Sequence, residues 1–236
     1  MAARRPNQTK PTVAEIVKSL QAMASKSVRD GMARYAIPAD KAFGISVGSL
    51  QAFAKKLGLS HDLALGLWKT GWYEARLLAC MLDEPDRVTP KQMDEWCKDF
   101  DSWAICDTAC FKLFDQTPHA FTKFRQWAKR KPEFEKRAAF ALLASLALHD
   151  KETGDERFTE CLPLVEAASV DDRNFVKKGV SWALRGIGRR SRALHSLSVA
   201  VARRLAAAGE AASRWIGKDA LRELTGPVVL RQLAKK

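Results

Sequence analysis

The chain has 236 residues, 47% of them hydrophobic, and a formal net charge of +13. This apolar content is enough for a substantial core in one extended domain or two small ones. No run reaches the roughly 18 apolar residues of a membrane span, and no apolar stretch follows the N-terminal basic residues as in a secretory signal. We therefore expect a soluble, cytoplasmic protein without membrane contact, in which residues 1–10 form a flexible tail and residues 11–236 a single helical domain.

Helical periodicity runs along nearly the whole chain, and strand alternation is almost absent. Thr89-Pro90 and Thr117-Pro118 each resemble an N-cap followed by proline at the first helical position, and Asp171 and Asp172 suit the start of a helix. The expected helices, in chain order, are 12–26, 28–35, 47–57, 60–69, 72–83, 89–99, 102–115, 117–130, 133–149, 155–168, 173–188, 191–207, 209–223 and 227–235. Short turns join them, so the pattern predicts an all-α fold.

Pairs of these helices recur about every 30–40 residues, which is the spacing of helical repeats. The segments "YEARLLACML", "EKRAAFALLASL" and "KKGVSWALRGI" each place basic residues beside an alanine- and leucine-rich run. A two-helix unit cannot bury its own apolar face, and stacking such units makes one continuous core. We predict HEAT-like two-helix repeats stacked into a curved right-handed solenoid with a basic concave face; a compact helical bundle is the alternative.

The cysteines are scattered and odd in number, which favours free buried thiols over a disulfide framework. They are Cys80, Cys97, Cys106, Cys110 and Cys161. Cys106 and Cys110 lie one helical turn apart and could share a metal, but no CxxC pair and no HxxxH pattern accompanies them. We expect no metal and no cofactor.

Positive charge is concentrated at the C-terminal end. From residue 171 onward there are 15 Lys/Arg against 5 Asp/Glu, which supplies +10 of the net +13. Such asymmetry favours a polyanionic partner, whereas the simpler reading is a solvated basic surface.

The segment 173–188 combines an apolar stripe with an unusual opposite face. The stripe consists of Val176, Val180, Ala183, Leu184 and Ile187. Lys178, Trp182, Arg185 and Arg189 fall on the other side, where a tryptophan is unexpected. Either a neighbouring helix or Arg185 covers Trp182, or the ring and its cations form a nucleic-acid surface. Arg190 and Arg192, at the following turn, extend this basic surface.

Asp107 is a carboxylate within the apolar segment "SWAICDTACFKLF" (102–114). On a helix it shares one side with Trp103, Cys110, Phe111 and Phe114, and a charge there is unfavourable unless something pairs with it. Arg137, in an alanine-rich helix, could form a structural bridge to an acidic residue or have a functional role. A bridge to Asp107 would combine both and keep the carboxylate ionised.

Three motifs occur in order along the chain: Trp103-x-x-x-Asp107, Arg137 in its alanine-rich helix, and "FVKKGVSWALR" with Trp182. Together they resemble the AlkD-type DNA alkylation repair glycosylases, which are built of HEAT-like repeats. "FGISVGSLQAFAKKLG" (43–58) and "LWKTGWYEARLLACML" (67–82) are similar to the N-terminal half of that family. The resemblance covers roughly residues 20–225. Ala104 and Ile105 stand where relatives often carry a second aromatic or acidic residue.

The resemblance implies hydrolysis of the N-glycosidic bond of N3-alkyladenine or N7-alkylguanine in double-stranded DNA, without a metal, by a monomer at the bacterial nucleoid. It implies catalytic roles for Asp107, Trp103 and Trp182. The expected DNA-binding residues are Arg137, Lys178, Arg185, Arg189, Arg190 and Arg192. The alternatives are a non-catalytic HEAT-repeat protein that binds damaged, branched or distorted DNA, and a protein–protein scaffold, which the concentrated charge disfavours.

Overall fold

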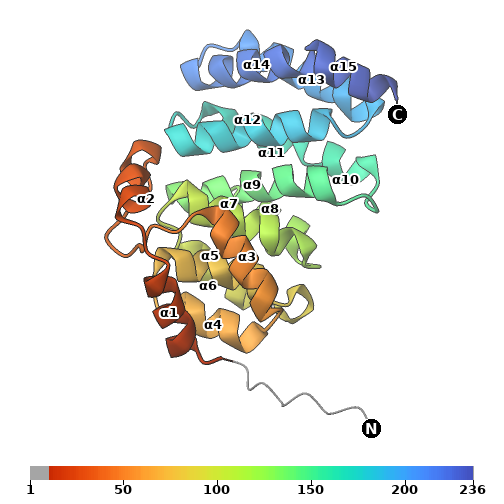
Figure 1. The fold of residues 1–236 in the computed structure, drawn as a ribbon. Coiled ribbons are helices and arrows are strands. Elements are labelled where there is room, and N and C mark those ends of the chain that lie inside the picture. The colour runs from red at the N-terminus through yellow and green to blue at the C-terminus, as the bar shows by residue number, and fades with distance from the viewer. Residues whose placement is uncertain (1–10, 236) are drawn as a thin grey trace. The chain divides into compact units, whose positions relative to one another are not determined.

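The computed structural model of the chain describes residues 11–235, and every regular element among them is a helix (Figure 1). The expected tail, residues 1–10, lies outside the described residues. The chain divides after Arg87 into two compact units, and the single domain expected over 11–236 stays a prediction. No helix between residues 11 and 235 combines the length and apolar character needed to cross a bilayer.

The first unit consists of short helices. They are α1 (Val13–Ala22), α2 (Lys26–Gly31), the 3-10 turn η1 (Met32–Tyr35), α3 (Val47–Leu57), α4 (His61–Lys69), α5 (Tyr73–Leu82) and the 3-10 turn η2 (Pro85–Arg87). Helix α5 packs against both α3 and α4. The expected helix 12–26 ends at Ala22. A new helix, α2, follows because Ser25 is its N-cap and its side-chain oxygen accepts a hydrogen bond from the N–H of Val28.

A buried carboxylate fixes the loop that leads into α3. Glu74, on α5, accepts backbone N–H groups from Phe43, Gly44 and Ile45 at 2.9, 2.7 and 3.1 Å. Gly44 has a φ of 81°, and a Cβ there would lie 2.3 Å from the carbonyl oxygen of Ser25. Only glycine fits this position, which accounts for the "FGI" at the start of the segment 43–58.

The second unit carries the C-terminal charge. Its elements are α6 (Pro90–Lys98), α7 (Trp103–Lys112), η3 (Phe114–Gln116), α8 (Ala120–Trp127), α9 (Glu133–His149), α10 (Asp155–Thr159), α11 (Leu162–Ala167), η4 (Ala168–Val170), α12 (Asn174–Gly188), α13 (Arg192–Ala206), α14 (Ala211–Leu224) and α15 (Pro227–Ala234). The contact of α12 with α13 joins an expected pair, 173–188 with 191–207, whereas α8 packs on α9 and α13 packs on α14, which belong to different expected pairs.

Helices α7, α9, α12 and α14 stack in the same direction as successive layers (Figure 1). The thiols of Cys106 and Cys110 donate to the carbonyls of Phe134 and Ala138, respectively. Helices α7 and α9 therefore run parallel to each other. Equivalent hydrogen bonds join neighbouring layers. Asp107 and Arg137 are 30 positions apart along the chain, Arg137 and Phe175 are 38 apart, and Ser181 and Asp219 are 38 apart. This spacing matches the predicted repeat, and the five cysteines are free and buried, as predicted.

Two of the expected helices in this unit differ from the prediction at a proline and at a threonine. The expected helix 155–168 is broken into α10 and α11, and Pro163 lies in the first turn of α11. Proline lacks the N–H that a helix interior requires, so the break is a local necessity. The hydroxyl of Thr117 donates to the carbonyl of Phe114 rather than capping α8, which begins only at Ala120. The expected Thr89 cap, by contrast, is present and is followed by Pro90.

Asp171 fixes the start of α12 by an ion-pair network. Its carboxylate accepts two bonds from the guanidinium of Arg173, at 2.9 and 2.6 Å, and one from the ammonium of Lys136 at 2.9 Å. These bonds, chiefly those of Arg173, lower the pKa of Asp171 well below its ordinary value. A carboxyl with a lowered pKa in the folded state stabilises the fold above its unfolded pKa of about 4, and the contribution fades as the pH falls below that.

Asp171→Asn is therefore expected to lower the free energy of unfolding at pH 7 by about 2 kcal/mol. The difference between the variant and the wild type should narrow progressively as the pH falls below about 4. Urea unfolding followed by circular dichroism at several pH values measures both effects. Asp172→Asn, the same change at the exposed neighbouring position, is the control; a difference independent of pH would contradict the role of ionised Asp171.

Candidate active site and nucleic-acid interface

Helix α12 presents the two faces that its sequence predicts. The apolar stripe is fully buried: Val176, Val180, Ala183, Leu184 and Ile187. On the opposite side Lys178 and Arg189 are exposed, and Trp182 and Arg185 are half-buried. The tryptophan therefore lies outside the core stripe, among cations.

The ring of Trp182 is held by an aromatic contact from α7. Phe111 stacks on it with the ring centroids 4.9 Å apart and the planes inclined by 11°. His149, at the end of α9, meets the same phenylalanine edge-on at 5.2 Å. A neighbouring helix thus covers part of Trp182 and fixes the orientation of the indole. Cover by a neighbouring helix was one of the two alternatives that the sequence left open for this residue.

Asp107 has the partner that its apolar surroundings require. Nε and Nη2 of Arg137 donate to its two oxygens at 2.9 and 2.7 Å, and Nη1 of the same guanidinium donates to the carbonyl of Phe175 at 2.8 Å. The exposed fractions of the two side chains are 18% for Asp107 and 8% for Arg137. The contact joins three successive layers, because Asp107, Arg137 and Phe175 belong to α7, α9 and α12.

Burial raises the pKa of the Asp107 carboxyl, and the charge and hydrogen bonds of Arg137 oppose that rise. Burial disfavours the charged form of Arg137 too, but the adjacent carboxylate outweighs it and raises the pKa of the guanidinium. A guanidinium is always charged at neutral pH, and its two-point contact favours the ionised carboxylate. Asp107 is therefore an oriented anion. Trp103, half-buried, begins α7 one turn earlier on the same side.

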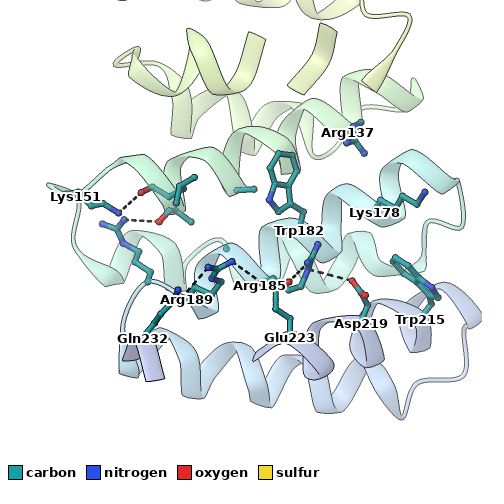
Figure 2. A pocket seen from close by; sticks show the side chains of 15 residues that line it. Arg137, Lys151, Lys178, Trp182, Arg185, Arg189, Trp215, Asp219, Glu223 and Gln232 are labelled. Atoms are coloured by element: carbon teal, nitrogen blue, oxygen red, sulfur yellow. Dashed lines mark hydrogen bonds and ion pairs between the residues drawn. The ribbon is translucent and has the colours of Figure 1, made fainter. Parts of the chain in front are cut away.

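A hollow of about 510 Å³ opens beside this pair, between α9, α12 and α14 (Figure 2). Arg137 and Trp182 line it, and Asp107, bound behind Arg137, does not. The cations that line the hollow are Arg137, Lys151, Lys178, Arg185, Arg189 and Arg190. Two carboxylates, Asp219 and Glu223, face them from α14. The excess of positive charge suits an anionic ligand.

The predicted DNA-binding cations on α12 differ in how they are engaged. Lys178 has no ion-pair or hydrogen-bond partner among residues 11–235. Nη1 of Arg185 donates to Glu223, and Nη1 of Arg189 donates to the other oxygen of the same carboxylate at 3.3 Å. Asp219 lies 3.6 Å from Nε of Arg185. Glu223 thus links the two arginines and neutralises part of the surface that they present.

Two further predicted cations bind the chain's own carbonyls. Arg190 donates to Asp150 and Thr153 beyond the end of α9, and its guanidinium lies 4.1 Å from the ring centroid of Phe158. Arg192 donates to the carbonyls of Leu233 and Ala234, both at 3.0 Å. These contacts satisfy carbonyls at the ends of α9 and α15 and in the loop after α9, and a role in DNA binding stays a prediction for both residues.

The chain is similar to known proteins in both sequence and fold. Residues 16–224 match the family model described as "DNA alkylation repair enzyme". The chain belongs to this family. A solved structure, described as "A new family of proteins related to the HEAT-like repeat DNA glycosylases with affinity for branched DNA structures", shares 18% identity, covers 91% of this chain and 96% of its own, and superposes with a TM-score of 0.76. That likeness confirms the all-α, HEAT-like fold. No curated protein matches the chain.

Three residues of the site were not predicted from the sequence: Phe111, Trp215 and Glu223. Phe111 was placed on the same side as Asp107, but nothing local indicated that it stacks on Trp182. Trp215 lines the hollow and lies off the buried stripe of α14, so the periodicity argument used for Trp182 could have found it. Glu223 could not have been found, because its pairing depends on how α14 registers against α12.

Proposed function

We propose that this member of the DNA alkylation repair enzyme family is a DNA glycosylase that hydrolyses the N-glycosidic bond of cationic alkylated purines, N3-alkyladenine and N7-alkylguanine, in duplex DNA. The observation that carries the proposal is an oriented, partly buried carboxylate, Asp107, held by an arginine that itself lines a cationic, tryptophan-bearing hollow. A monomeric state and a place at the bacterial nucleoid, both expected from the sequence, are part of the same proposal.

The chemistry requires little from the protein. An N3- or N7-alkylated purine already carries positive charge, so the bond between C1′ and the purine nitrogen can break with the base leaving as a neutral molecule. The deoxyribose becomes oxocarbenium-like, and a water oxygen then bonds to C1′ and loses a proton. Asp107 lies behind Arg137 rather than in the wall of the hollow, but 18% of its side chain is exposed, and we assign to it the stabilisation of the developing cation and the orientation of the water. The ring of Trp103 and the face of Trp182 that Phe111 leaves open attract the same positive charge.

Arg137 has a positioning role in this proposal. Its bonds to both oxygens of Asp107 and to the carbonyl of Phe175 fix the carboxylate relative to α9 and α12. Lys178 and Lys151 are both exposed on the hollow. Lys178 is available to a backbone phosphate, and Lys151, which donates to the carbonyl of Leu148, has further N–H groups to offer. Binding through such contacts releases counterions and therefore weakens steeply with salt.

The direct test is incubation of the protein with methylated duplex DNA, followed by chromatography of the released bases. Free 3-methyladenine and 7-methylguanine, above the spontaneous loss measured without protein, are expected. Unmethylated duplex of the same sequence is the control substrate. Release no faster than the spontaneous rate would overturn the glycosylase proposal.

Non-catalytic binding of branched or distorted DNA is the second candidate. It is favoured by the full engagement of Asp107, since both of its oxygens are bonded to Arg137 and the residue does not line the hollow. The solved neighbour's description also names affinity for branched DNA. This candidate predicts no base release but tighter binding of a three-way junction than of a linear duplex of equal length.

Glu223→Gln is expected to raise the affinity for duplex DNA by about three- to tenfold at fixed salt. The carboxylate of Glu223 competes with phosphate for Arg185 and Arg189, and removing its charge removes this competitor from both guanidinium groups. One additional phosphate contact would steepen the dependence of log K on log salt by about 0.9. Fluorescence anisotropy of a labelled duplex, titrated at several salt concentrations, measures both quantities.

Glu210→Gln is the matched control, because it changes the net charge equally at an exposed position at the start of α14, away from the hollow. An equal gain of affinity in the two variants would show that only the overall charge matters, and would contradict competition by Glu223.

A further inference from the structure

Trp215 is an unusually open aromatic side chain. All seven tryptophans lie among the described residues, and Trp215 alone is exposed, at 39%. It projects from α14 at the edge of the hollow, on the side where Lys178 lies (Figure 2). A large apolar ring left in water on a concave, charged surface suits a ligand that covers it.

The ring is held by a cation and by no other aromatic group. The ammonium of Lys177, on α12, lies 5.0 Å from the ring centroid of Trp215. No ring in the described part of the chain stacks on it, in contrast to Trp182, which Phe111 already covers. One turn along α14, Asp219 accepts a bond from the hydroxyl of Ser181 at 2.7 Å and so ties the helix to α12. Trp215 is thus an unstacked indole on a firmly placed helix.

We propose that Trp215 is a stacking site for an unpaired nucleobase, and that Lys178 binds the adjoining phosphate. This inference rests on the DNA binding of the proposed function and adds a class of ligand to it. In an intact duplex both faces of each base are covered by neighbouring bases, so an exposed indole can stack only on a base that is unpaired or terminal. Stacking of this kind tolerates any base, because every base has a flat π-face.

Charge favours nucleic acid over a protein partner at this position. Lys177 lies over the ring, and Lys178 and Arg137 line the same hollow. Aromatic rings interleaved with cations are the arrangement that single-stranded nucleic acid requires, with bases on the rings and phosphates on the cations.

The test compares two labelled probes by fluorescence anisotropy: a long blunt duplex, in which terminal bases are a small fraction of the binding sites, and the same duplex with a bulge of unpaired thymidines. Both probes have the same ends, so a difference between them reports on the bulge. The wild type should bind the bulged duplex about tenfold more tightly. Trp215→Ala should abolish this preference while changing the affinity for the blunt duplex less than about twofold, and Trp215→Phe should retain most of the preference. Leu230→Ala, an exposed apolar position on α15 outside the hollow, should behave as the wild type.

The inference is overturned if the wild type does not prefer the bulged probe, or if Trp215→Ala keeps the wild-type preference. Binding of the blunt duplex with no preference defeats this inference and leaves the DNA binding of the proposed function standing, whereas binding of neither probe defeats both. Sedimentation of the wild type and of Trp215→Ala adds a further arm. A dimer that dissociates on this substitution would show that the ring is a protein contact and would overturn the inference.

Discussion

Replacing Arg137 with methionine is expected to lower the free energy of unfolding by about 3–5 kcal/mol, because Asp107 would be left as a buried charge without its counterion. Methionine is uncharged and replaces the aliphatic part of the arginine side chain, so part of the packing is kept while the charge is removed. The carbonyl of Phe175 also loses its donor, which loosens the contact between α9 and α12. Urea unfolding at pH 7, followed by circular dichroism, measures the change.

Arg204→Met is the matched control for this prediction. Arg204 binds Glu166 with the same two-point geometry, at 2.9 and 2.7 Å, but its side chain is 58% exposed. Exposed pairs of this kind contribute about 0–1 kcal/mol. If Arg137→Met lowered stability no more than Arg204→Met, the burial of the Asp107 pair would have no energetic consequence. Asp107→Asn added to Arg137→Met should restore part of the lost stability, since it removes the unpaired charge.

The sequence predicted the buried and exposed faces of the helices wherever helical periodicity alone decides which residues share a face. The burial of Val176 and Ile187 and the exposure of Lys178 on α12 follow from their spacing. The pairing of Asp107 with Arg137 was one of two alternatives, and it could be named because a buried carboxylate needs a cation and Arg137 lies about one repeat further along the chain.

The register of one helix layer against the next could not be predicted from the sequence. Glu223 meets Arg185 across 38 residues, and Arg190 reaches the carbonyl of Asp150 across 40. A shift of one helical turn between the layers would exchange these partners without altering any local pattern. From the sequence alone, arginines near a turn are therefore predicted to bind phosphate. In the structure, Arg190 instead donates to carbonyls beyond the end of α9.

Asp107→Asn is expected to slow the release of 7-methylguanine by about 10²- to 10³-fold, if the carboxylate stabilises the cationic sugar as proposed. This is the usual effect of removing one preorganised group that faces a developing charge. Asparagine is nearly isosteric with aspartate but carries no charge, so the shape of the site is kept. Single-turnover release at saturating protein isolates the chemical step from DNA binding.

The loss in Asp107→Asn should fall on the rate of base release while the affinity for the duplex is retained, because Asp107 does not line the hollow and contributes no phosphate contact. Asp101→Asn is the matched control, as it makes the same change of charge at an exposed position just before α7 and should release base at the wild-type rate. The variant also weakens the bond to Arg137, so the assay is run well below its measured unfolding temperature. If folded Asp107→Asn released base as fast as the wild type, the carboxylate would be only the counterion that places Arg137 at the wall of the hollow, and the catalytic group would have to be sought elsewhere.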